Sequence, residues 1–427
     1  MASISIPELL PTPSQDAEKL KRAFEAALLN VKKQGWLVVS GLGTDERAVI
    51  TILGRRNAEQ RMQISLAYES LYKQSLIASL ESELSGDFRK AVILWVQDPP
   101  QRDAKLAREA LRKKGTKHKA VIIEIACAAS PHHLVAVRQA YCSLFDCSLE
   151  EDITLYVPQP LRKLLLSLVS SYRYDKEVVD EYVAKLEAGQ LHEAVKKKHL
   201  DQEHILWILS TRNESQLKAT FNFYNQDYGK PFEQDIKNCG NSEFLSLLRT
   251  ATWCIETPEK HFAEVIRESI VGLGTDEDSL TRAIVTRAEV DMLNISEEYY
   301  KVNKGSLADA VIGDTSGDYK DFLLTLIGEM KRWRLNTWLG VTPYSKHSVG
   351  HSEQQLHMLV ECGAIKPVEG LSNSPDINCL MWGNNAREFR FRHCRRHMLL
   401  SDAGLLLCMG KLFGTRICGN HVPINSS

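Results

Sequence analysis

The sequence contains no run of about 18 or more apolar residues, so it predicts no transmembrane helix. Its first residues lack a basic segment followed by an apolar core, and we therefore expect no secretory signal peptide. A net charge of −1 gives no overall field that would attract nucleic acid. The ten cysteines show no regular framework, which favours reduced thiols in a cytosolic protein over disulfides.

Four segments of the chain repeat one pattern. A tyrosine stands at the same phase of each segment, as Tyr68, Tyr141, Tyr224 and Tyr299. Apolar residues around them recur with helical periodicity, and no sustained period-2 alternation typical of strands is present. The pattern predicts an all-α protein built from four units of about 70 residues.

Two stretches do not fit the repeats. Residues 26–40 lengthen the approach to the first unit's glycine loop, and the fourth unit has no counterpart to them. Residues 329–427 repeat nothing upstream, hold five of the ten cysteines, and have poor amphipathic periodicity. We expect the first stretch to be an insert and the second to be a poorly ordered extension.

One motif occurs twice, as Gly-Leu-Gly-Thr-Asp-Glu at residues 41–46 and 272–277. A carboxylate follows each copy at the same distance along the chain, so that Gly43 leads to Glu83 and Gly274 leads to Asp314. Glycines allow a tight loop to turn several backbone carbonyls outward, and a distant carboxylate can add charge and close the site. A hard cation such as Ca²⁺ takes about six to eight oxygen ligands, so water or a phosphate oxygen would complete this set.

The candidate ligands follow from this spacing. In the fourth unit they are the carbonyls of Ile270, Gly272 and Gly274 with the Asp314 carboxylate. In the first unit they are Val39, Gly41, Gly43 and Glu83, and we include Thr44 and Glu46 in the same site. The alternative is that each loop only ends one helix and caps the next. Thr275 with Asp278 three residues later predicts a capping box at the start of the helix that follows the second copy. The doubled spacing favours the cation sites.

The second and third units lack the glycine pair. Their corresponding segments read Arg-Lys-Lys-Gly-Thr-Lys at 112–117 and Lys-Lys-Lys-His-Leu-Asp at 196–201. Lysines would repel a cation, so we predict no metal there. We interpret these lysines as solvated surface, with direct contact to anionic lipid headgroups as the alternative.

The chain resembles the annexin family, and plant annexins most closely, over residues 14–328. The resemblance rests on the two loops with Glu83 and Asp314 and on the segment Gly-Asp-Thr-Ser-Gly-Asp-Tyr at 313–319. It implies five-helix repeats in a curved disc and Ca²⁺-dependent attachment to acidic phospholipid membranes. The expected domains are repeats at 14–98 (with insert 26–40), 99–172, 180–256 and 257–328, followed by a non-homologous extension at 329–427. Because the insert replaces the residues that lead into the first loop, we expect the fourth repeat to hold the better site.

The resemblance also raises other activities. Cys127 and Cys254 match a proposed redox cluster of the family, whereas Gly54 stands where a catalytic histidine is credited in some relatives. No Gly-x-x-x-x-Gly-Lys-Ser/Thr loop supports nucleotide hydrolysis. We predict a non-enzymatic protein in the cytoplasm, peripheral on the plasma membrane or endomembranes. A side activity in thiol redox or nucleotide hydrolysis, or a scaffold with structural calcium only, is the alternative. Self-association on membranes is open, and Leu206-Trp207-Ile208 does not match the actin-binding motif of some relatives.

Overall fold

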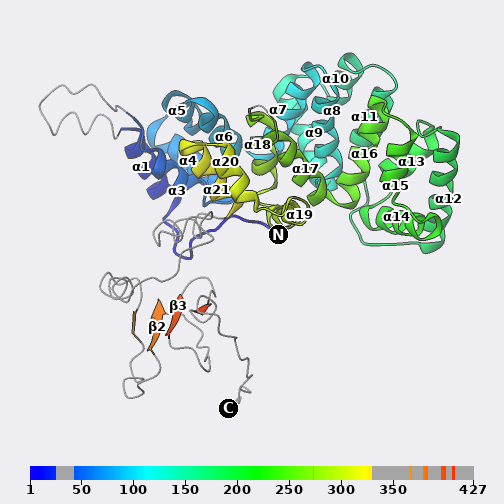
Figure 1. Ribbon diagram of the computed structural model, residues 1–427. Coiled ribbons are helices and arrows are strands. Elements are labelled where there is room, and N and C mark those ends of the chain that lie inside the picture. Colours follow the sequence, from blue (N-terminus) through cyan, green and yellow to red (C-terminus); the bar gives the residue numbers. More distant parts are fainter. Residues whose placement is uncertain are drawn as a thin grey trace, which may run out of the picture. The chain divides into compact units, whose positions relative to one another are not determined.

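The computed structural model describes residues 1–25, 43–272 and 274–328 together with four short strands beyond residue 365. The chain divides into two compact units, Met1–Trp338 and Leu339–Ser427. The described part of the first unit contains 20 helices, five in each repeat (Figure 1). For the four repeats, this confirms the prediction of an all-α fold built from five-helix units.

The helices follow one another in the same order in each repeat. The first repeat contains α1 (Pro13–Phe24), α3 (Glu46–Leu53), α4 (Ala58–Tyr72), α5 (Leu76–Glu83) and α6 (Gly86–Val96). The second contains α7 (Pro99–Arg112), α8 (Thr116–Cys127), α9 (Pro131–Phe145), α10 (Leu149–Tyr156) and α11 (Leu161–Ser170). The third contains α12 (Glu181–Lys197), α13 (Glu203–Thr211), α14 (Glu214–Tyr228), α15 (Phe232–Cys239) and α16 (Glu243–Glu256). The fourth contains α17 (Pro258–Ile270), α18 (Glu277–Arg287), α19 (Met292–Asn303), α20 (Leu307–Asp314) and α21 (Gly317–Ile327).

The second unit contributes four short strands that the sequence pattern did not predict. They are β1 (Lys366–Pro367), β2 (Asn378–Trp382), β3 (Arg396–Leu400) and β4 (Leu406–Cys408). They form one sheet in the order β1-β2-β3-β4, in which β2 and β3 are parallel and the outer pairs are antiparallel. The expectation of poor order for the rest of 329–427 falls outside the described residues.

The repeated tyrosines occupy one structural position. Tyr68, Tyr141 and Tyr224 are fully buried on α4, α9 and α14, and Tyr299 on α19 is nearly so. The phenol of Tyr68 donates to Ser79 at 3.2 Å, and that of Tyr224 donates to Asp235 at 2.9 Å. Each partner lies on the next helix of the same repeat, so the phenol ties the two helices together. Burial of a large ring with its hydroxyl satisfied explains why an aromatic recurs at this phase.

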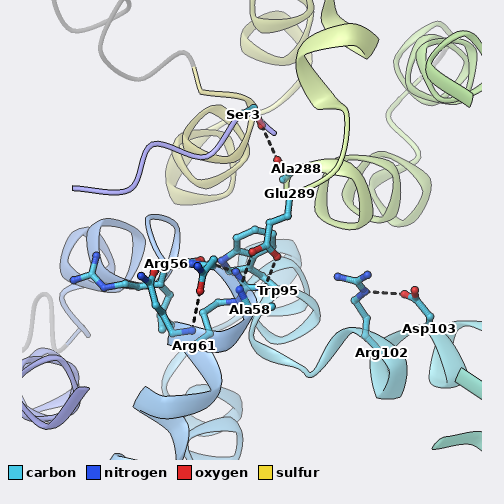
Figure 2. A network of polar contacts seen from close by, with 12 residues as sticks. Ser3, Arg56, Ala58, Arg61, Trp95, Arg102, Asp103, Ala288 and Glu289 are labelled. Atoms are coloured by element: carbon cyan, nitrogen blue, oxygen red, sulfur yellow. Dashed lines mark hydrogen bonds and ion pairs between the residues drawn. The ribbon is translucent and has the colours of Figure 1, made fainter. Parts of the chain in front are cut away.

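The repeats pack in pairs. One hydrophobic core is formed by the first and fourth repeats, and a second core by the second and third. A polar joint strengthens the first pair, because Glu289 accepts from the backbone N–H of Ala58 at 2.7 Å and from Arg61 at 2.8 Å (Figure 2). The Arg61 guanidinium also stacks 3.6 Å above the Trp95 ring. The two repeats that carry the glycine motifs therefore share one core.

The described residues on the two sides of 26–40 meet in the same way as in a repeat without that stretch. The backbone N–H of Asp45 donates to Ala23 at 3.0 Å, and that of Asp276 donates to Ser269 at 2.8 Å at the matching point of the fourth repeat. Asp45 and Ala23 lie further apart in the sequence than Asp276 and Ser269, and the difference equals the length of 26–40. The chain on both sides of the loop therefore keeps the geometry of a repeat without an insert.

Candidate metal centres

The fourth-repeat loop joins α17 to α18. Two of its backbone positions have positive φ, +146° at Gly272 and +86° at Gly274, in a region that residues with a Cβ rarely adopt. Apart from the chain neighbours of each glycine, no atom of the described residues lies within 4 Å of the position that a Cβ would take on either one. The loop is therefore open on the side of both glycines, and Ile270 ends the helix that leads into it.

Asp314 lies beside this loop, as the sequence spacing predicted. It is the last residue of α20, and its carboxylate oxygen Oδ2 accepts a 2.6 Å hydrogen bond from the Thr275 hydroxyl. The same hydroxyl lies 3.1 Å from the Asp314 carbonyl oxygen. Thr275 thus fixes the acid next to the glycine turn, and hydrogen bonds of this kind orient the carboxylates that ligate metal ions.

The first-repeat motif shows the same contact in a looser form. The Thr44 hydroxyl lies 3.2 Å from the Glu83 carboxylate and 3.4 Å from its carbonyl oxygen, and Glu83 is the last residue of α5. Gly43 is exposed beside Thr44. Val39 and Gly41 fall outside the described residues, so the structure brings together only part of this predicted ligand set.

The helix caps differ from the prediction. Asp276, and not Thr275, caps α18, because its Oδ1 accepts from the Ser279 N–H at 3.2 Å. Asp45 caps α3 in the same way, through the Ala48 N–H at 3.0 Å. The predicted Thr275–Asp278 capping box is wrong because the threonine hydroxyl is already engaged by Asp314. The aspartate of the motif therefore caps the helix, and the threonine binds the distant acid beside the loop.

Glu46 lies with the acids of the fourth repeat. It lines a cavity of about 340 Å³ together with Glu277 and Asp314. Asp87 and Asp318 also line this cavity, whereas Glu83 does not. Five carboxylates on one cavity wall favour cations over anions there.

The residues of the fourth-repeat loop fit a hard cation. The set would consist of the carbonyls of Ile270, Gly272 and Gly274 and the Asp314 carboxylate, all of them oxygen donors of the kind that Ca²⁺ prefers. In the described part of the chain, no three His, Cys, Asp or Glu side chains gather as a metal cluster. The donors at this loop are mostly backbone oxygens.

Comparison with known proteins identifies the architecture. The Annexin family model matches four segments, residues 37–95, 102–168, 187–250 and 261–326. The chain belongs to the annexin family. Annexin D3 of Arabidopsis thaliana is 50% identical over 333 residues, which cover 77% of this chain and 99% of that protein. The annexin-like protein RJ4 of Fragaria ananassa is 50% identical over 291 residues, 68% of this chain and 92% of the relative.

Solved structures agree with this assignment. Annexin III superposes with a TM-score of 0.67 at 31% identity, covering 77% of this chain and 97% of that chain. A calcium-bound annexin (Sm)1 superposes with a TM-score of 0.65 at 29% identity, covering 77% and 93%. The relatives make this chain a plant-type annexin. Ca²⁺ is the ion of the family, and calcium-dependent phospholipid binding is its general activity.

Two lysines of the second-repeat loop, Lys113 and Lys117, have ion-pair partners in this annexin. Lys117 forms an ion pair with Asp276, and the Lys113 ammonium lies 3.5 Å from the Asp278 carboxylate. The interpretation of these lysines as plain solvated surface is therefore incomplete. The sequence carried a signal for these pairs, because the second-repeat loop is basic and the first turn after the fourth-repeat loop is acidic. Only the packing of the repeats shows that the two segments meet.

The positions linked to enzymatic side activities are poorly suited to them. Burial raises the pKa of the Cys127 and Cys254 thiols, and each thiol therefore holds its proton more tightly than a free cysteine. Redox chemistry needs the thiolate. At Gly54, a Cβ would come within 2.7 Å of the Ile50 carbonyl and 2.9 Å of the Thr325 methyl group, so a histidine has no room there.

Proposed function

We propose that this annexin is a non-enzymatic protein that attaches peripherally to acidic phospholipid membranes through Ca²⁺ held at the fourth-repeat loop. The observation that supports this most is the Thr275–Asp314 contact beside the open turn of Gly272 and Gly274. A loop of neutral carbonyls with one carboxylate leaves coordination positions for outside oxygens, and lipid phosphates can supply them. In the described chain, no helix is long and apolar enough to cross a bilayer.

The first-repeat site plays the smaller part in this proposal. Its threonine–carboxylate contact is longer, 3.2 Å against 2.6 Å in the fourth repeat. The stretch 26–40 also leads directly into its loop. We place the protein in the cytoplasm, on the inner face of the plasma membrane or on endomembranes, wherever acidic lipid is exposed.

Co-sedimentation with phosphatidylserine vesicles, in calcium or in chelator, tests the proposal. Asp314→Asn removes the charge that closes the fourth-repeat site and should raise the calcium concentration for half-maximal binding about tenfold or more. Asp318→Asn is the matched control, because it removes the same charge from the wall of the same cavity without touching Thr275. It should change that concentration by less than about threefold.

The outcomes separate the alternatives. Vesicle binding that is indifferent both to calcium and to Asp314→Asn would overturn the proposal. Calcium binding in solution without any vesicle retention would instead support a scaffold whose calcium is structural. Glu83→Gln should have a smaller effect than Asp314→Asn, and the reverse order would assign the main site to the first repeat.

A further inference from the structure

The basic loop of the second repeat contacts the segment that directly follows the calcium loop of the fourth repeat. Lys117 pairs with Asp276, which stands next to Thr275 at the end of that loop. Lys113 lies 3.5 Å from Asp278, and Lys90 of α6 lies 3.4 Å from the other oxygen of the same carboxylate. Three lysines, one from the first repeat and two from the second, thus converge on two aspartates of the fourth repeat.

Asp276 divides its carboxylate between two tasks. Oδ1 caps α18 through Ser279, and Oδ2 accepts the Lys117 ammonium. The Lys117 side chain is 61% exposed and that of Asp276 is 32% exposed. A pair this open to water is weak, so a nearby change in charge is enough to shift its population.

The surroundings of these lysines are rich in positive charge. The basic loop of the second repeat and the acidic turn of the fourth repeat line one cavity of about 450 Å³, and Arg89 and Lys105 also lie on its wall. Neither Arg89 nor Lys105 has an ion-pair partner among the described residues. Burial and the charges of Lys113, Lys117 and other cations lower the pKa of His118 at the same wall. Asp276, Asp278 and Glu109 are the acids on this wall, and of these Asp276 and Asp278 hold Lys117 and Lys113.

We propose that Lys113 and Lys117 form a phosphate-binding element whose availability is controlled by the calcium loop of the fourth repeat. Without Ca²⁺, Asp276 and Asp278 hold the two lysines. With Ca²⁺ in the adjacent loop, the positive charge of the ion weakens both pairs, and the lysines become free to contact a phosphate group. This inference rests on the proposed calcium site and adds to it a second, basic contact for the anion.

Linkage makes the proposal quantitative in both directions. If bound Ca²⁺ weakens the Lys117–Asp276 pair, then the pair must weaken Ca²⁺ binding by the same factor. Exposed ion pairs are worth up to about 1 kcal/mol, which corresponds to about a fivefold change in affinity. Removing Lys117 should therefore tighten calcium binding in solution and also weaken binding to phosphate.

Calorimetric titration with Ca²⁺ in a Glu83→Gln background tests the first half, because only the fourth-repeat site then reports. Lys117→Gln should lower the calcium dissociation constant about two- to fivefold. Lys114→Gln is the matched control, since it removes the same charge from an exposed neighbour without an ion pair among the described residues. It should change the constant by less than about 1.5-fold at physiological salt, where exposed charges are largely screened.

Vesicle binding tests the second half. At saturating Ca²⁺, Lys113→Gln/Lys117→Gln should bind phosphatidylserine vesicles about threefold or more weakly than the unmodified chain. Inorganic phosphate that competes for the unmodified chain but not for the double variant would identify a free phosphate as a sufficient ligand. If inorganic phosphate does not compete and only vesicles are bound, the lipid headgroup is identified as the ligand of the two lysines.

Failure of this inference is distinguishable from failure of the calcium site. If the Glu83→Gln chain takes up no Ca²⁺ at all, the proposed function itself is wrong. If it binds Ca²⁺ but Lys117→Gln and Lys114→Gln give equal constants, the coupling is wrong and the function stands. Equal vesicle binding by the double variant and the unmodified chain at saturating Ca²⁺ would also overturn the phosphate-binding role.

Discussion

At the scale of single residues, Thr275 determines how well Asp314 can serve as a ligand. Its hydroxyl donates to the carboxylate at 2.6 Å, and no other described side chain donates to that carboxylate. Thr275→Val keeps the shape of the side chain and removes the donor. We expect the calcium dissociation constant of the fourth-repeat site to rise about tenfold, the lower limit for loss of a group that orients a metal ligand.

Thr315→Val provides the control for this prediction. Thr315 lines the same cavity as Asp314 and directly follows it, but its hydroxyl donates to the Val311 carbonyl of the preceding helix at 2.6 Å. Calcium titration should place this variant within about twofold of the unmodified chain. Equal losses in both variants would mean that the hydroxyl of Thr275 has no orienting role.

These residues also show what the sequence could and could not determine. The sequence placed the acid beside its loop correctly because the same three helices separate the two in each repeat, α3 to α5 in the first and α18 to α20 in the fourth. An equal spacing along the chain therefore brings each acid back to the loop of its own repeat. The cap was placed wrongly because Thr275 and Asp276 are both good capping residues. Only the contact with Asp314, which is distant in sequence, decides between them.

At the scale of helices, the joint between the first and fourth repeats depends on Glu289. Arg61 is almost completely buried, and that burial lowers its pKa while Glu289 opposes the shift. Glu289→Gln leaves a buried guanidinium without its counter-charge, and we expect the free energy of unfolding to fall by about 3 kcal/mol. Chemical denaturation measures this change.

Glu297→Gln is the control for the joint. Glu297 is exposed and has no ion pair among the described residues, so its loss should change the free energy of unfolding by less than about 0.5 kcal/mol. Similar losses in the Glu289 and Glu297 variants would contradict the role of the joint.

The pairing of repeats could not be read from the sequence. Periodicity predicted four helical units, because each unit carries the same buried tyrosine and the same apolar faces. It did not show that the first repeat shares a core with the fourth and the second with the third. The insert at 26–40, in contrast, could be predicted from the spacing of the repeats. Asp16 and Arg56 pair in the first repeat as Glu187 and Arg212 do in the third, and their separation in the sequence is greater by the length of 26–40.

At the scale of the whole molecule, the four repeats hold every group that the proposed function uses. Both hydrophobic cores lie within residues 17–327, and the calcium loops, their acids and the second-repeat lysines lie within the unit Met1–Trp338. Annexin D3 matches 77% of this chain with 99% of its own length, so the remainder of this chain has no counterpart in that relative. Calcium-dependent vesicle binding should therefore not require residues 339–427.

A chain that ends at residue 338 tests this expectation. It should sediment with phosphatidylserine vesicles at the same calcium concentration as the full chain, within about twofold, because distant and independent parts contribute additively. Asp314→Asn in the shortened chain is the necessary companion, since it should raise that concentration about tenfold, as it does in the full chain. A large loss of calcium-dependent binding on shortening alone would assign part of the membrane contact to the unit Leu339–Ser427, which lies beyond the four repeats that the Annexin family model matches.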